Sequence, residues 1–212
     1  MLLCVLVSSL FCAKYVEAAD ITEDVNNLAE TAKSTADAFL RESFDLRMKY
    51  QYNGCSLDEP DRKKLYNLAA KASGELETIA KVQQSLKTKI ENYQAPDWDE
   101  KYGKTGFWRK LTSELYITTI LLCDADFYLA VTADPDEKKK TLLDILSRID
   151  SLGKAVRSPD ARLIKAKTTA QLARTELAYK PSAIHLFNSL VSDIEAPEQI
   201  RFRAAIEQIN FT

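Results

Sequence analysis

Apolar residues three or four positions apart recur through most of the chain, and this spacing constrains the fold more than any other feature. Such spacing places apolar side chains on one face of an α-helix, whereas few windows show the strict alternation expected of half-buried strands. Glycine, which interrupts helices, occurs only five times in 212 residues. The sequence therefore predicts an almost entirely α-helical protein.

Residues 21–92 are expected to form a long antiparallel helical hairpin. Helical spacing from Ile21 to about Tyr52 predicts a single first helix, roughly 45 Å long at 1.5 Å per residue. Asn53 and Gly54 end it, and residues 56–60 offer capping and first-turn chemistry for the next helix. The second helix carries one apolar stripe on a charged rod: Leu65, Leu68, Ala72, Leu76, Ile79, Val82, Leu86 and Ile90.

A linker loop over residues 93–106 leads to a third helix, expected from about Thr105 to Thr132. Its apolar residues cover nearly all azimuths, which is typical of the central helix of a domain. They are Ile117, Ile120, Leu121, Leu122, Cys123, Phe127, Tyr128 and Leu129. Charges and threonines occur throughout this helix, so we do not interpret it as membrane-spanning.

The last third of the chain is divided by prolines at 135, 159, 181 and 197. Each proline stands where a new helical pattern begins, as expected for a first helical turn. The predicted helices cover residues 136–154, 160–178, 182–194 and 198–209, joined by short connections. With the three earlier helices this gives about seven, arranged as antiparallel hairpins in a bundle or short solenoid.

One segment is echoed thirty-eight positions later. Pro159-Asp160 with Ile164, Lys165 and Ala166 corresponds to Pro197-Glu198 with Phe202, Arg203 and Ala204. Over residues 135–212 the paired helices resemble the α-hairpins of tetratricopeptide-like repeat proteins, although the offset differs from the usual thirty-four residues. The resemblance implies a protein- or peptide-binding surface. Hairpins packed on a longer helix pair would give much the same pattern.

The N-terminal segment has the features of a secretory signal peptide over residues 1–18. An apolar run from Leu2 to Cys12 has the length of a signal-peptide core, and Val16 and Ala18 match a small-residue cleavage site. We therefore expect an exported protein, periplasmic or extracellular and most simply of the bacterial envelope, with one all-helical domain over residues 19–212 and no stable membrane span. Because no basic residue precedes Lys14, retention as a short anchor is the alternative.

Charge and residue counts argue against several functional classes. The 29 basic and 31 acidic residues are interspersed, so the sequence lacks the basic patch expected of a nucleic-acid binder. A single histidine, His185, leaves too few ligands for zinc or a di-metal bundle and disfavours hydrolytic triads. We expect no metal and no cofactor. Cys55 and Cys123 could form a disulfide, but a buried free thiol is the usual state for Cys123 within an apolar helix.

The segment from Trp98 to Arg109 has the most unusual composition in the chain. Aromatic and basic side chains on a glycine-containing loop can bind a ligand or peptide by ring stacking and charge pairing. The candidate binding residues here are Trp98, Tyr102, Lys104, Trp108 and Arg109. The alternative is that both tryptophans only anchor a long connection against the core.

Asp126 is an acidic residue on an apolar helix face. Eighteen residues make five helical turns, so Asp126 is aligned with Trp108 and should be buried. A buried carboxylate needs a cation or several hydrogen-bond donors. Asp126 therefore either pairs with a basic side chain of an adjacent helix or lines a polar pocket.

Three functional hypotheses follow, of which the first is preferred. The first is a non-enzymatic interaction or scaffold protein that binds a protein or peptide partner between its helical hairpins. The second is a small-molecule-binding or catalytic domain that uses residues 98–109 and Asp126. The third is a structural subunit of an envelope assembly, with the long hairpin as the oligomer contact.

Overall fold

The computed structural model describes residues 18–52, 56–93, 96–153 and 157–211. Within these ranges the secondary structure is helical and no strand occurs, so the all-α prediction is confirmed. The expected signal peptide lies outside the described residues except for Ala18, where α2 begins. Cys55 also lies outside them.

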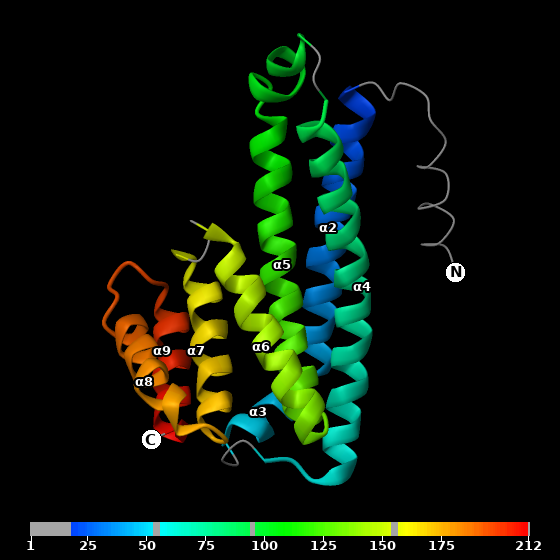
Figure 1. Cartoon of the computed structure of the whole chain (residues 1–212). Coiled ribbons are helices and arrows are strands. Elements are labelled where there is room, and N and C mark those ends of the chain that lie inside the picture. Colours follow the sequence, from blue (N-terminus) through cyan, green and yellow to red (C-terminus); the bar gives the residue numbers. More distant parts are fainter. Residues whose placement is uncertain (1–17, 53–55, 94–95, 154–156, 212) are drawn as a thin grey trace.

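Three long helices form the main bundle: α2 (Ala18–Glu42), α4 (Glu59–Glu91) and α5 (Phe107–Thr132) (Figure 1). The buried positions of α4 alternate in steps of four and three, the seven-residue repeat of a coiled coil. They are Leu65, Ala69, Ala72, Leu76, Ile79, Gln83 and Ile90. On α2 the same steps separate Val25, Ala29, Ala32, Ala36 and Phe39. These repeats place one continuous seam of each helix toward the bundle axis.

The expectation of one helix over residues 21–52 is wrong, because the chain bends at Ser43 into α2 and the short α3 (Phe44–Tyr52). The Ser43 hydroxyl donates a hydrogen bond to the Phe39 carbonyl and accepts one from Arg47 Nε at 3.0 Å. Arg47 Nη2 also donates to the Leu40 carbonyl at 3.0 Å. Side-chain bonds to backbone carbonyls of this kind bend helices. Here they turn α3 across the lower end of the bundle (Figure 1).

The second helix forms as the sequence predicts. Asp58 precedes it in an extended conformation and accepts a hydrogen bond from the Asp61 amide at 3.0 Å, while Pro60 lies in the first turn. This arrangement satisfies one of the free amides at the helix start. At the other end, the connection expected to be a loop contains one π-helical turn, Asp99–Gly103 (η1). Gly106 then adopts φ 71°, a left-handed conformation that favours glycine, immediately before α5.

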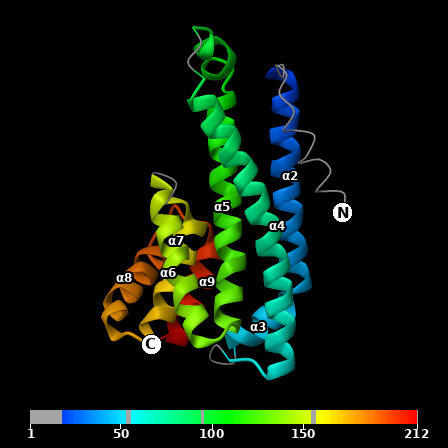
Figure 2. The same ribbon diagram turned by 45° about the vertical axis from the view of Figure 1, so that its right-hand side comes forward.

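The remaining helices are α6 (Pro135–Ser151), α7 (Pro159–Ala173), α8 (Lys180–Val191) and α9 (Glu198–Phe211). They lie beside the lower half of the long bundle (Figures 1 and 2). Prolines stand at or next to each of their starts, as expected. The helix predicted for residues 160–178 ends earlier, at Ala173, and is followed by a 3-10 turn, Leu177–Tyr179 (η3).

Two apolar clusters meet at α7. The larger one joins α2, α4, α5 and α6 and includes Ala161 and Ile164 of α7. The smaller one joins α8 and α9 and includes Leu163 and Ala166 of α7. α5 is the described helix long and apolar enough to cross a membrane by length and composition. In this structure it contacts α2, α4, α6 and α7 and is the central helix, as predicted.

Candidate functional site

The aromatic residues of the 98–109 segment form a compact group at the upper end of the bundle. The ring centroids of Trp98 and Trp108 are 6.2 Å apart, and Tyr102 lies 6.2 Å from Trp98 and 5.9 Å from Phe107. Trp98 Nε1 donates a hydrogen bond to the Ile90 carbonyl at 2.9 Å. This group packs on a small cluster of buried residues: Val25, Ile90, Phe107 and Leu111. The geometry matches the interpretation in which the tryptophans anchor the connection.

The two basic residues predicted to bind a ligand, Lys104 and Arg109, are both exposed. Lys104 lies 3.7 Å from the Asp99 carboxylate, and both side chains are exposed. Arg109 is exposed on the first turns of α5. The cation over the Trp108 ring is instead Lys87 of α4, with its Nζ 5.6 Å from the centroid. The basic side chains of the segment therefore point to solvent rather than into a common pocket.

Asp126 is 4% exposed and is paired, as the helical alignment predicts. Its Oδ2 lies 2.7 Å from Arg148 Nη1 on α6, and its Oδ1 accepts a hydrogen bond from the Ser73 hydroxyl on α4. Arg148 also pairs with the exposed Asp144. The carboxylate thus ties α4, α5 and α6 together, and its two oxygens both have donors.

Burial dominates the titration of the groups around Asp126. It raises the pKa of the Asp126 carboxyl above its ordinary value of 3.8, because the opposing effects of Ser73 and Arg148 are smaller. The neighbouring Cys123 is a fully buried free thiol, and burial raises its pKa to about 12. Such a thiol is inert as a nucleophile at neutral pH. These groups are structural in character.

The structure separates the two halves of the predicted site. Asp126 and Trp108 face the same side of α5, but the eighteen positions between them amount to about 27 Å along the helix axis. Trp98, Tyr102 and Trp108 are brought together, while Asp126 lies in the lower half of the bundle. They cannot line one pocket. The hypothesis of a joint site from residues 98–109 and Asp126 loses its geometric basis.

A second buried polar centre was not anticipated. Lys167 on α7 is 2% exposed, with Nζ 3.2 Å from the Tyr128 hydroxyl and 3.5 Å from the Asp124 carboxylate. The ammonium also lies over the rings of Phe127 and Tyr128, 4.2 and 4.6 Å from their centroids. Burial lowers the pKa of Lys167, but Tyr128 and Asp124 outweigh it, so the pKa is raised overall. Lys167 therefore remains a cation that joins α7 to α5.

The short helix α3 carries the surface that sequence reasoning missed. Its outer side presents Phe44, Met48 and Tyr52 at four-residue intervals, with Phe44 55% and Tyr52 64% exposed. Buried polar groups hold its inner side. Arg47 Nε donates a hydrogen bond to the Ser43 hydroxyl, and the Tyr50 hydroxyl accepts a hydrogen bond from Gln171 at 2.8 Å. The four-residue spacing of Phe44, Met48 and Tyr52 was visible in the sequence. These residues could be recognised as an outer stripe only once the bend at Ser43 was known.

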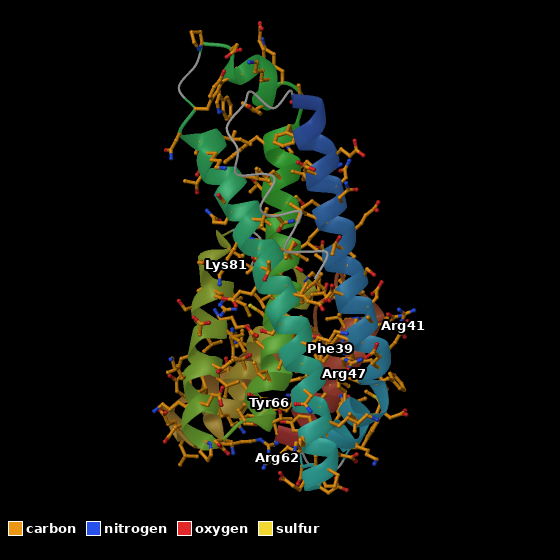
Figure 3. The ribbon with its side chains drawn as sticks, turned by 90° about the vertical axis from the view of Figure 1, so that its right-hand side faces the viewer. Phe39, Arg41, Arg47, Arg62, Tyr66 and Lys81 are labelled. Atoms are coloured by element: carbon orange, nitrogen blue, oxygen red, sulfur yellow. The ribbon has the colours of Figure 1, made fainter. Side chains whose placement is uncertain are left out.

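Two open depressions flank this outer stripe, and Phe44 lines both. The first, of about 590 Å³, includes Asp37, Arg41 and Arg47. The second, of about 650 Å³, is lined by α3 and the start of α4: Glu42, Phe44, Asp45, Leu46, Met48, Lys49, Tyr52, Asp61 and Lys64. Figure 3 shows Arg41 pointing outward from α2, whereas Phe39 and Arg47 lie against the bundle. We call the stripe of Phe44, Met48 and Tyr52 the α3 ridge: Phe44 separates the two hollows, and Met48 and Tyr52 border the second.

Among the residues that the structure describes, no group of three histidine, cysteine, aspartate or glutamate side chains is arranged to hold a metal ion. Comparison of the chain with protein-family models, with curated proteins and with solved structures finds no match. Function must therefore be argued from the surface of this chain alone.

Proposed function

We propose that the chain is an exported, non-enzymatic interaction protein that binds a partner protein through the outer side of α3. The carrying observation is the ridge of Phe44, Met48 and Tyr52, which borders one open depression along its length and a second one at Phe44. Large apolar side chains spaced along an exposed ridge are typical of a contact surface rather than of ordinary surface residues. Export rests on the signal-like features of residues 1–18.

The charges beside the ridge favour an amphipathic helix as the bound element. On one side Arg41 and Asp37 face the hollow with opposite charges, because Arg47 is buried and bonded to Ser43 and the Leu40 carbonyl. On the other side Lys49 is already paired with Asp61 at 2.6 Å, and Glu42 and Asp45 face Lys64 alone. A partner helix with apolar residues over the ridge and basic residues on the flank that meets Glu42 and Asp45 would match this pattern.

The adjoining helix α9 extends the apolar surface. Phe202 and Ile209 lie seven residues apart on one side of α9 and are 64% and 74% exposed. The α9 end contacts α3 directly, because Asn210 Nδ2 donates a hydrogen bond to the Gln51 carbonyl at 2.6 Å. The nine residues of α3 span only about 14 Å. Since a stable interface buries roughly 800 Å² on each partner, α9 and the end of α2 would have to contribute.

Site-specific photo-crosslinking tests this proposal. A photoreactive residue at Met48, introduced in the native host, is expected to capture one stoichiometric partner that is identified by mass spectrometry. The same residue at Lys81, on an exposed face of α4, is the matched control and should not capture it. Equal capture at both positions, or capture at neither, would contradict binding through α3.

Affinity measurements with the captured partner complete the test. Phe44→Asp places a charge at the centre of the ridge and should weaken binding at least tenfold by calorimetry. Leu143→Asp, at a 40% exposed position on α6, serves as the control and should leave the affinity unchanged. If both variants bind as the wild type does, the ridge is not the contact surface.

A further inference from the structure

Gln83 is the most anomalous polar residue of the bundle core. It occupies a buried position in the seven-residue repeat of α4 and is 0% exposed. Neither its amide nitrogen nor its carbonyl oxygen has a hydrogen-bond partner among the described residues. A buried amide without partners is costly, and natural cores contain few of them. Its presence at a core position therefore calls for a functional explanation.

The contacts on either side fix the level of Gln83 in the bundle. Thr35 on α2 donates a hydrogen bond to Glu75 on α4 at 3.1 Å. Gln83 lies eight residues, about 12 Å, further along α4, which corresponds to the level of Asn27 on the antiparallel α2, between the buried seam residues Val25 and Ala29. Lys87 lies over Trp108, so Gln83 is also level with Thr112 on α5. The Thr112 hydroxyl is a second buried group without a described partner.

Below this level the seam of α2 carries only small side chains until Phe39, whereas the fully buried Val25 lies just above it. The seam residues between the two are Ala29, Ala32 and Ala36, each at most 6% exposed. The apolar packing is interrupted near the same level, because the upper cluster around Val25 and the larger lower cluster are separate. Alanine buries little area, and each methyl-sized reduction weakens the contact. The seam between α2 and the α4–α5 hairpin is therefore thin just below Gln83 and Thr112.

The polar contacts that hold α2 at this height are peripheral. They are Thr35 with Glu75, Lys33 with Glu114 at 3.7 Å, and Lys110 with Asn26. Lys33 and Lys110 are exposed, and although Glu114 is only 15% exposed, its 3.7 Å pair with Lys33 is long, so these contacts contribute little. α2 lies at one edge of the long bundle, beside α4 in Figure 2, and it contacts both α4 and α5.

We propose that the upper half of α2, residues 23–36, is a displaceable helix, and that the groove it covers between α4 and α5 accepts an amphipathic helix of a partner. The favoured occupant carries an amide side chain level with Gln83 and larger apolar residues in place of Ala32 and Ala36. It would satisfy the buried amide and bury more apolar area than α2 does. This groove is distinct from the α3 ridge, so either proposal can fail alone.

A labelled peptide tests the occupant. The probe is a synthetic peptide of residues 23–40 with Ala29→Gln, Ala32→Leu and Ala36→Leu, and its binding to the full chain is followed by fluorescence anisotropy. It should bind at least tenfold more tightly than the unmodified 23–40 peptide, which lacks the amide at position 29 and the added apolar area. Absence of binding, or equal binding of both peptides, would overturn the proposed occupant.

A covalent lock tests the displacement. In a background with Cys4→Ser, Cys12→Ser and Cys55→Ser, Thr35→Cys and Glu75→Cys joined by a short bis-maleimide link α2 to α4. Cys123 is fully buried and should not react. The lock should abolish peptide binding. A matched link between α6 and α7, through Asp150→Cys and Lys165→Cys, should leave binding unchanged. Peptide binding that survives the first lock would show that α2 is not displaced.

Hydrogen exchange provides a readout independent of the peptide. In the unmodified protein, amides of residues 23–36 should exchange at least tenfold faster than amides of residues 76–83 in α4, and the Thr35–Glu75 lock should remove the difference. Gln83→Leu, which makes the seam apolar, should slow exchange in residues 23–36. Equal protection of α2 and α4 in the unmodified protein would contradict the displaceable helix.

Discussion

Asp126 is the residue whose removal should reveal most about the long bundle. Its carboxylate accepts hydrogen bonds from α4 and α6. When the carboxylate is removed, Arg148 is only partly stranded, because it is about a third exposed and keeps Asp144 as a partner. Asp126→Ala is therefore expected to lower the free energy of unfolding by about 2 to 3 kcal/mol, below the loss for a wholly buried pair.

Urea unfolding measures this effect. Asp144→Ala removes the exposed partner of the same arginine and is the matched control, with an expected loss below about 1 kcal/mol. Equal losses for the two variants would show that burial of Asp126 does not decide its contribution.

The same carboxyl should stand out by its titration. Burial raises the pKa of Asp126, whereas the hydrogen bond from Arg162 lowers the pKa of Asp193 on the surface. Because folded Asp126 holds its proton more tightly than the unfolded chain does, its contribution to stability should fall as pH rises from 3.8 through its folded pKa. Carbon-detected NMR should find Asp126 titrating above 3.8 and Asp193 below it. The reverse order would contradict the assigned causes.

Residue-scale prediction from the sequence succeeded where helical periodicity alone decided the outcome. Eighteen residues of regular α5 were enough to predict that Asp126 is buried. Its partner Arg148 was not predictable, because the facing of α6 against α5 depends on packing between distant segments. Gln83 was overlooked for a related reason. Whether a polar residue within an apolar stripe has a hydrogen-bond partner cannot be known until the neighbouring helices are placed.

At the scale of elements, α4 illustrates how capping controls a helix start. Asp58 accepts a hydrogen bond from the Asp61 amide, whereas Asp134, at the start of α6, makes no such side-chain bond. Asp58→Ala should lower the free energy of unfolding by about 1 kcal/mol. Asp134→Ala is the matched control and should lower the free energy of unfolding by less than about 0.5 kcal/mol in the same thermal or urea experiment. A larger loss for Asp134→Ala would show that capping is not the cause.

The joint between α5 and α7 gives a prediction that compares two substitutions. Lys167→Ala leaves a cavity beside Phe127 and should destabilise by about 2 to 4 kcal/mol. Lys167→Met fills nearly the same volume, and the Asp124 carboxylate that loses its partner is 21% exposed and can be hydrated. We therefore expect Lys167→Met to lower the free energy of unfolding by less than Lys167→Ala does, by about 1 kcal/mol. A loss as large as that of Lys167→Ala would mean that the charge itself holds the joint.

Most helix positions were predictable because prolines and capping residues mark them in the sequence. The starts at Pro135 and Pro159 needed no tertiary information. The bend at Ser43 was missed because a serine within a helical pattern does not by itself predict a bend. The bend depends on the hydrogen bonds from Arg47 to both Ser43 and the Leu40 carbonyl. The π-helical turn at Asp99–Gly103 was missed because glycines and aromatic residues there are equally typical of a loop.

At the scale of the whole molecule, the remaining prediction concerns its start. α2 begins at Ala18, beside the expected cleavage site. Cleavage there would leave α2 as the N-terminal element, so if the segment is a signal peptide, N-terminal sequencing of the protein purified from its host should give Ala19 as the first residue. Recovery of an intact Met1 in the membrane fraction would instead show that the segment serves as an anchor.

The position of α7 limits how this sequence can change. Opposite sides of α7 belong to the two apolar clusters, with Ile164 on one and Ala166 on the other. Inserting or deleting one residue in this helix would rotate the following residues of α7 by about 100° about the helix axis. The apolar side chains of both clusters would then be out of position. Variation among descendants of this gene should therefore appear in α7 as substitutions of similar volume, while changes in length accumulate in the connections on either side of it.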